Sequence, residues 1–139
     1  MSALLPDLEI QQSIFARASA DETITETFAA GVYDEPPEDA PRPYLIVGDA
    51  PFTTTRDESH GTFGWETVIT VSIWVEQRGF KLAHELAQRL VELFHRQPME
   101  LPSFHVVDVR LEMSQLLRDP SNPRLRRSQV RLRIRTEQT

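Results

Sequence analysis

The sequence predicts an α+β fold, in which a single antiparallel or mixed β-sheet of four to five strands has two helices packed on one face. Two hydrophobic patterns carry this prediction. Apolar and polar residues alternate from Trp65 to Val75, as in a strand with one buried face, whereas apolar residues recur every three to four positions from Ala83 to Phe94, as in an amphipathic helix. The 139 residues suffice for one hydrophobic core, so we expect a single domain over residues 1–139.

The first expected element is a helix from about Pro6 to Ala20. Proline suits the first turn of a helix, and Asp7 and Glu9 follow it where the helix dipole favours negative charge. One side of this helix carries apolar residues spaced by four, with Phe15 alongside: Ile10, Ile14 and Ala18. We therefore expect one side of the helix to be buried and the rest to face solvent.

Short elements and long connections are expected between this helix and the Trp65 strand. Residues 21–30 fit a short helical turn, and residues 32–33 fit a brief strand. Five of the ten prolines fall within residues 36–51, together with several acids, which predicts an extended acidic loop. Residues 44–48 fit a short apolar strand, and the polar residues 51–64 are expected to form a long connection.

The second half of the chain contains the clearest patterns. The strand at residues 65–76 has one core face, formed by Trp65, Thr67, Ile69, Val71, Ile73 and Val75. A helix follows Gly79, is expected to stop at Pro98, and has an apolar stripe of Ala83, Leu86, Ala87, Leu90, Val91 and Phe94. The next strand is expected to place on one face His105, Val107, Val109, Leu111 and Met113. The last strand separates Val130, Leu132 and Ile134 from Arg131, Arg133 and Arg135.

Charge divides the chain into two parts. The net charge is −6, but residues 1–66 carry 13 acids and three arginines, and residues 67–139 carry 8 acids and 12 bases. Such asymmetry indicates either a basic patch for an anionic partner or complementary faces on neighbouring copies. The N-terminus has no basic region typical of a signal peptide, and the apolar residues 68–75 are too few to span a membrane, so we expect neither feature.

The residues that carry enzymatic chemistry do not form recognisable motifs. The absence of cysteine excludes a thiol nucleophile and cysteine-ligated zinc, and five scattered glycines form no phosphate-binding loop. His84-Glu85 resembles a metalloprotease motif, but Gln88 occupies the position of the second histidine ligand. Asp57, Ser59 and His60 would form a catalytic triad only if the fold brought them together with a pocket. We therefore expect no catalytic, cofactor or metal site, and a protein that is not an enzyme.

The strongest feature outside the core is an arginine ladder, which we define as Arg127, Arg131, Arg133 and Arg135. Residues two apart on a strand project to the same side, so the ladder has three interpretations. A subunit interface ranks first, and a solvated face ranks second. Nucleic-acid binding ranks third, because the chain is acidic overall and no aromatic residues interleave the arginines.

Four segments together resemble a known family in their order and spacing. They are LPDLEIQQSIFARASAD, GVYDEPPEDAPRPYLIVGD, TVSIWVEQRGFKLAHELAQRLVELF and LLRDPSNPRLRRSQVRLRIRTEQ, and they cover nearly the whole chain. This arrangement resembles the tail-completion or tail-terminator proteins of long-tailed, non-contractile phages and of gene transfer agents. The pair Tyr33-Asp34, the Trp74 strand end and Gly79 before the helix fall where that family has them.

The resemblance implies a structural assembly protein without catalytic residues. Such a protein forms a ring, usually of six copies, that caps the head-proximal end of the tail tube, stops tail polymerisation and joins the tail to the head. The implied partners are other copies of itself, the tail tube protein and the head–tail connector (stopper) protein, with DNA only as cargo passing through the ring. The implied location is the tail and neck region of a virion or phage-like particle, assembled in the host cytoplasm. The alternatives are another neck or connector ring protein, or an arginine-ladder nucleic-acid-binding module.

Two groups of residues are predicted to make these contacts. We expect copies to associate head to tail, with the arginine ladder of one copy meeting acids from the proline-rich loop of the next: Asp34, Glu35, Glu38 and Asp39. We also expect the connection at residues 53–63 to be mobile in the free protein and to order against a partner. Its contacting residues would be Thr53, Thr54, Thr55, Arg56, Asp57, Glu58, His60 and Phe63.

Overall fold

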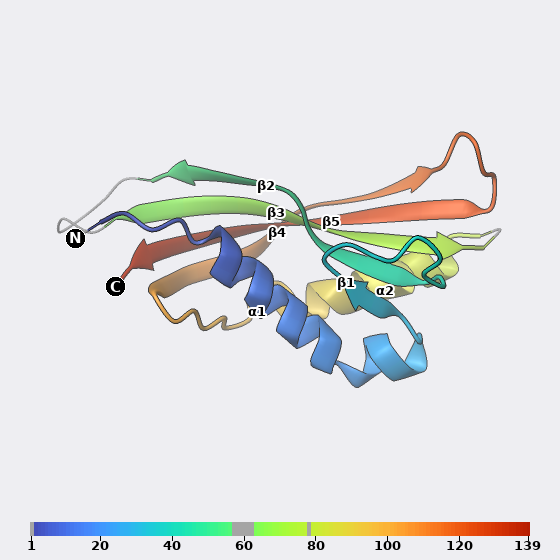
Figure 1. The fold of residues 1–139 in the computed structure, drawn as a ribbon, viewed down its shortest axis with the longest axis horizontal. Coiled ribbons are helices and arrows are strands. Elements are labelled where there is room, and N and C mark those ends of the chain that lie inside the picture. Colours follow the sequence, from blue (N-terminus) through green and yellow to red (C-terminus); the bar gives the residue numbers. More distant parts are fainter. Residues whose placement is uncertain (1, 57–62, 78) are drawn as a thin grey trace.

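The computed structural model describes residues 2–56, 63–77 and 79–139, which form one mixed five-stranded sheet with helices on one face (Figure 1). The elements in chain order are α1 (Asp7–Ala20), a π-helical turn η1 (Thr23–Thr27), β1 (Gly31–Tyr33), β2 (Tyr44–Thr55), β3 (Gly64–Glu76), α2 (Lys81–Phe94), β4 (Phe104–Arg118) and β5 (Leu125–Gln138). The strand order is β1-β2-β3-β5-β4, with β1 parallel to β2 and all other neighbours antiparallel. The predicted α+β fold is confirmed.

The core lies between the sheet and the two helices. The centre of the sheet is β3 paired with β5, and the buried partners Ile69 with Leu132 and Val71 with Val130 face the helices. The predicted alternation of β3 and β5 is therefore confirmed. The predicted stripe of α2 is also buried, apart from the partly buried Val91: Ala83, Leu86, Ala87, Leu90 and Phe94. This helix ends at Phe94, before the expected stop at Pro98.

Helix α1 covers the β1–β2 side of the sheet, and its buried residues are the predicted Ile10, Ile14 and Ala18. Polar contacts hold both of its ends. The Arg17 guanidinium donates hydrogen bonds to the carbonyls of Leu93, at 2.9 Å, and Pro98, and it stacks on the ring of Phe94. Near the other end, the Ser103 N–H donates to the Glu9 carboxylate at 2.9 Å.

Strand β2 is longer than the sequence predicts. The expected connection at residues 51–64 is wrong over residues 51–55, which pair with β3 in a ladder that includes Thr53 with Thr67 and Thr55 with Trp65. The reason is a double register shift around Gly48 and Ala50, whose φ angles are 89° and 48°. This irregularity interrupts the apolar alternation, so the second half of the strand has no continuous pattern.

Strand β4 departs from the predicted face in the same way. Register shifts between Val106 and Asp108 and between Leu111 and Met113 interrupt its alternation. His105 therefore pairs with Glu137 and Met113 pairs with Arg131, on the sheet face away from the helices, and Val107 is exposed. The predicted common face is right for Val109, which is buried, and Leu111, which packs against the core, and wrong for His105, Val107 and Met113.

Candidate functional site

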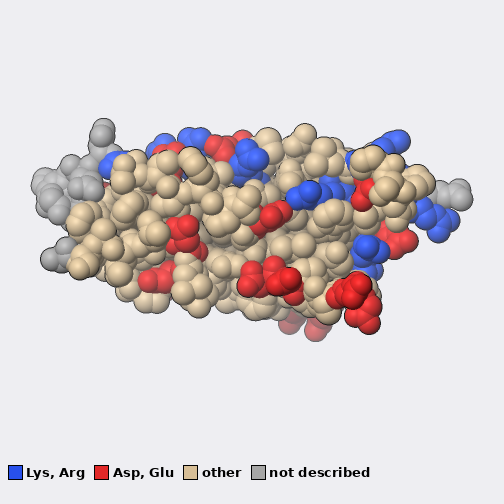
Figure 2. Space-filling view, turned by 45° about the horizontal axis from the view of Figure 1, so that its top comes forward, with Lys and Arg blue, Asp and Glu red and all other residues tan. Residues whose placement is uncertain are grey.

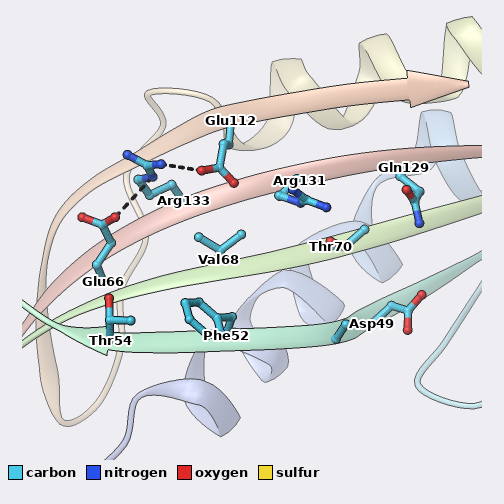
Figure 3. Close-up of a pocket in the computed structure, with 11 residues that line it drawn as sticks. Asp49, Phe52, Thr54, Glu66, Val68, Thr70, Glu112, Gln129, Arg131 and Arg133 are labelled. Carbon is cyan, nitrogen blue, oxygen red and sulfur yellow. Dashed lines mark hydrogen bonds and ion pairs between the residues drawn. The ribbon is translucent and has the colours of Figure 1, made fainter.

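The sheet face opposite the helices, which we call the outer face, carries a hollow of about 460 Å³ (Figure 3). Phe52 and Val68 are cross-strand partners on β2 and β3 and give the hollow an apolar floor. Charged residues from four strands surround this floor: Asp49, Glu66, Glu112, Arg131 and Arg133. The side chain of Phe52 is 66% exposed, so the hollow presents an aromatic ring to solvent.

Three arginines of the ladder already form ion pairs within the chain. Arg133 lies between two acids, with its Nε 3.4 Å from Glu66 Oε1 and its Nη2 bonded to the Glu112 carboxylate (Figure 3). That hydrogen bond to Glu112 raises the pKa of Arg133 above its ordinary value, so the charge is fixed. Arg135 shares Glu66 at 3.4 Å and lies 3.7 Å from Asp108.

Arg127 is the third paired member of the ladder, and its Nη2 lies 3.0 Å from Asp49 Oδ2. Its guanidinium also stacks on the Trp74 ring, with the central carbon 5.1 Å from the ring centroid. Within the described part of the chain Arg131 has no ion pair, although it lines the same hollow. The ladder and its acidic partners therefore form a row of mixed charge and not a continuous basic strip, and Arg131 is its one arginine without an acidic partner among the described residues.

The acidic loop lies elsewhere on the molecule. Asp34, Glu35, Glu38 and Asp39 follow β1 and are all exposed, and none of them forms an ion pair with a described residue. Asp34 accepts a hydrogen bond of 2.7 Å from the Gln11 side chain of α1. Asp34, at the start of the loop, therefore lies beside α1 on the helix side of the sheet, whereas the ladder lies on the outer face. Figure 2 shows acidic side chains mainly in the lower half of the view, with basic side chains along the upper edge and at the right.

The predicted partner-contacting segment is only partly a loop. Thr53 donates a hydrogen bond to Asp7 Oδ1 at 2.7 Å and lies 3.0 Å from the Thr67 hydroxyl, while Thr54 and Thr55 are exposed strand residues. Arg56 Nη1 lies 3.9 Å from Glu137 Oε1, and the Phe63 carbonyl accepts a hydrogen bond from the Gln138 N–H. The remaining predicted residues, Asp57, Glu58 and His60, lie outside the described residues, as does Ser59.

Helix α1 also carries an exposed apolar surface that is not predicted above from the sequence. Leu8 and Phe15, which lie two helical turns apart, are 63% and 39% exposed, and Leu4 and Leu5 precede them in an equally exposed segment. The heptad spacing of Leu8 and Phe15 was the available signal. It was obscured because the buried Ile10 and Ile14 are also apolar and lie on an adjacent side of the helix.

One histidine on α2 and one directly after its C-terminal end contact other protein groups. The exposed His84 lies edge-on to Phe80, with ring centroids 6.4 Å apart, and His95 Nδ1 accepts a hydrogen bond from the Leu111 N–H. Across residues 2–56, 63–77 and 79–139, no three His, Asp or Glu side chains converge as metal ligands. No helix in those ranges is long and apolar enough to cross a membrane.

Comparisons with known proteins give a family and a fold. A family model described as tail completion protein gp17 matches residues 12–137. Among solved structures, a chain of the "Virion of native gene transfer agent (GTA) particle" has a TM-score of 0.86. The two chains are 18% identical, and the similarity covers 97% of this chain and 99% of the other, so the likeness shows a shared fold. A search of curated proteins finds no match.

Proposed function

The chain belongs to the family of the tail completion protein gp17, and on that premise we propose that it forms a ring that completes a phage-type tail. It is a structural protein of such a tail and a component of a virion or phage-like particle. The proposed ring has six copies, caps the head-proximal end of the tail tube, stops tube polymerisation and joins the tail to the connector. Each copy contributes residues 1–139 as one domain without a catalytic role, and the ring assembles in the host cytoplasm.

One observation carries the ring proposal: the chain leaves charges and apolar side chains unsatisfied on surfaces that cannot meet within one copy. The four loop acids have no cationic partner among the described residues, and Arg131 has no acidic one. A contact between two different surfaces, repeated by rotation, satisfies both in every copy and closes a ring. A two-fold dimer would satisfy both only if the two surfaces lay together in one self-complementary interface.

The ion pairs of the outer face change the role that we assign to the ladder. A neighbour's acid gains little from Arg127, Arg133 or Arg135, because it would compete with a carboxylate already in place. Arg131 is the ladder residue that is free to pair with an acid of the next copy. The other three would fix the register and orientation of the outer face, and apolar contacts would supply most of the affinity.

The same ion pairs weaken the nucleic-acid interpretation. Phosphate binding depends on arginines that can release counterions, and three of the four ladder arginines are neutralised locally by Glu66, Glu112, Asp108 and Asp49. DNA then passes the ring only as cargo. The strand end at residues 53–56, together with Phe63, would face the tube or the connector.

Two measurements test this function: the oligomeric state of the protein and the length of the assembled tails. Native mass spectrometry of the purified protein, alone and with its tube protein, should show a closed ring of six copies. Particles assembled without the protein should carry tubes of irregular length that fail to join heads in electron micrographs. Tails of normal length, joined to heads, in those particles would refute the proposed function.

Substitutions that remove or reverse charges test the role of the ladder. The variant with alanine at positions 131, 133 and 135 should close rings less well than the wild type. Arg131→Glu should weaken rings, and a compensating Glu38→Arg should restore part of the loss. If the triple alanine variant closes rings at high salt and at the wild-type concentration, the ladder is a solvated face.

A further inference from the structure

The exposed apolar side of α1 forms a defined surface, which we call the α1 stripe: Leu8 and Phe15 with the intervening Gln11 and Gln12. Together with Asp34 these residues line a shallow hollow of about 300 Å³ between the helix and the segment after β1. The stripe contains two of the six large apolar side chains that are exposed in the described chain. Soluble proteins leave single apolar residues exposed, but two on one side of a helix, beside a shaped hollow, favour an interaction surface.

A second surface lies at the other edge of the sheet. The outer edge of β4 and the segment after α2 enclose a hollow of about 450 Å³, which we call the β4 hollow. Its lining includes the 44% exposed Val107, the buried Met99, and Arg96 and Arg110. The Arg96 N–H is bonded to the Val109 carbonyl at 2.8 Å, so this part of the strand edge is closed to pairing with another strand.

These two surfaces are distinct, although the segment after α2 approaches both: the Pro98 carbonyl accepts a hydrogen bond from Arg17 of α1, and Pro98 also lines the β4 hollow. Helix α1 packs on β1 and β2, at one end of the strand order β1-β2-β3-β5-β4, and β4 is at the other end. We propose that the α1 stripe of one copy docks into the β4 hollow of the next. This inference rests on the proposed ring and adds a contact to it: Asp34 and Glu35 would meet the β4 hollow, which leaves Glu38 and Asp39 as the loop acids for Arg131.

Charge complementarity identifies a second copy of this chain as the occupant. The stripe borders Asp34, and the exposed Glu35 follows it in the chain; neither forms an ion pair with a described residue. The β4 hollow offers Arg96, whose exposed side chain has no partner in the described ranges, and Arg110, which is 3.1 Å from Asp108. The hollow therefore has one cation more than its single acid, and it faces a stripe bordered by acids.

The anchoring of α1 and the position of the acids also favour a contact between unlike surfaces. Leu8 and Phe15 lie on a helix that is anchored at both ends, so they are preorganised for a partner. A contact of stripe against stripe would bring Asp34 and Glu35 against their own copies. Pairing the stripe with the hollow avoids that repulsion and leaves a free stripe and a free hollow for the next copy, until the ring closes.

Two surface variants, whose ring formation is measured separately and then in a mixture, test the proposal. Leu8→Gln/Phe15→Gln removes the stripe while keeping good helix formers, and Val107→Glu adds an acid to the hollow. Each variant alone should fail to form rings, with association weaker by about tenfold or more, because each lacks one half of every contact. An equimolar mixture should form a dimer of the two variants, because one stripe and one hollow remain intact, but no ring. Ala20→Gln, at the exposed C-terminal end of α1 and outside both surfaces, is the control and should form rings as the wild type does.

The outcomes separate this inference from the proposed function. Rings formed by both variants would overturn the docking proposal and leave the ring function standing. A Val107→Glu variant that still dimerises through its stripe would overturn it in favour of a two-fold contact. A wild-type protein that remains monomeric even with its tube protein would overturn the ring function itself. Unchanged circular dichroism and melting temperature establish that the variants fold, and Arg96→Glu should weaken rings more than Arg96→Gln.

Discussion

Phe94 offers the sharpest test of how the helices pack on the sheet. It is fully buried at the end of α2, and the Arg17 guanidinium of α1 stacks on its ring, with the central carbon 5.3 Å from the ring centroid. The substitution Phe94→Ala would therefore remove a core side chain and a contact between the two helices in one step.

The expected cost follows from burial. A fully buried phenylalanine replaced by alanine costs roughly 3–5 kcal/mol, which combines the lost transfer energy with the cavity left behind. The loss of the cation–π contact adds about 0.5–1 kcal/mol, because Arg17 still donates to the Leu93 and Pro98 carbonyls and is not released. A total of about 3.5–6 kcal/mol is a large part of the roughly 5–15 kcal/mol by which domains are stable.

Urea unfolding followed by circular dichroism measures this loss. Wild type and variant should be compared at one protein concentration, because ring formation would add to the apparent stability. The matched control is Phe52→Ala on the outer face, which should cost less than about 1 kcal/mol because this ring is mostly exposed. A loss below about 1 kcal/mol for Phe94→Ala would show that α2 packs on the sheet with a different side.

Three further predictions concern single contacts. The hydrogen bond from Arg89 lowers the pKa of Asp21 below its ordinary value, so its contribution to stability is present above about pH 4 and is lost as pH falls further. The free energy of unfolding, measured as a function of pH, should therefore fall less steeply below pH ~4 for Asp21→Asn than for the wild type. Gly48→Ala should cost roughly 1–2 kcal/mol in urea unfolding, because φ is +89° and a Cβ would approach Gln11 Nε2 to 2.9 Å. Arg133→Gln should change stability by less than about 1 kcal/mol, with the difference shrinking as salt is raised in thermal melts, because the pair is partly exposed.

The elements with an uninterrupted period could be predicted from the sequence. The alternation of β3 and β5 and the helical stripe of α2 continue through each element, so the buried face follows directly from the order of residues. Strands β2 and β4 could not be predicted in full, because each contains two register shifts. One extra residue moves every later side chain to the other face, which is why Met113 lies opposite Arg131 and not in the core.

The sequence predicts which charged residues the candidate site contains, but it does not predict which of them form ion pairs. The sequence indicates that the ladder arginines share one face and that the loop acids are exposed, and both statements hold in the structure. It does not indicate that Glu66 lies between Arg133 and Arg135, because that contact depends on the pairing of β3 with β5. Nor does it distinguish the exposed Leu8 from the buried Ile10, which depends on the helix orientation.

The anchoring of α1 determines how copies can part from one another. Releasing this helix would break the Arg17 bonds, the Glu9 contact with Ser103 and the burial of Ile10 and Ile14. Exchange of this helix between protomers, as in domain swapping, would therefore require partial unfolding of both partners. Assembled copies should instead separate as intact folded units, so disassembly should be reversible and should not leave denatured chains that aggregate.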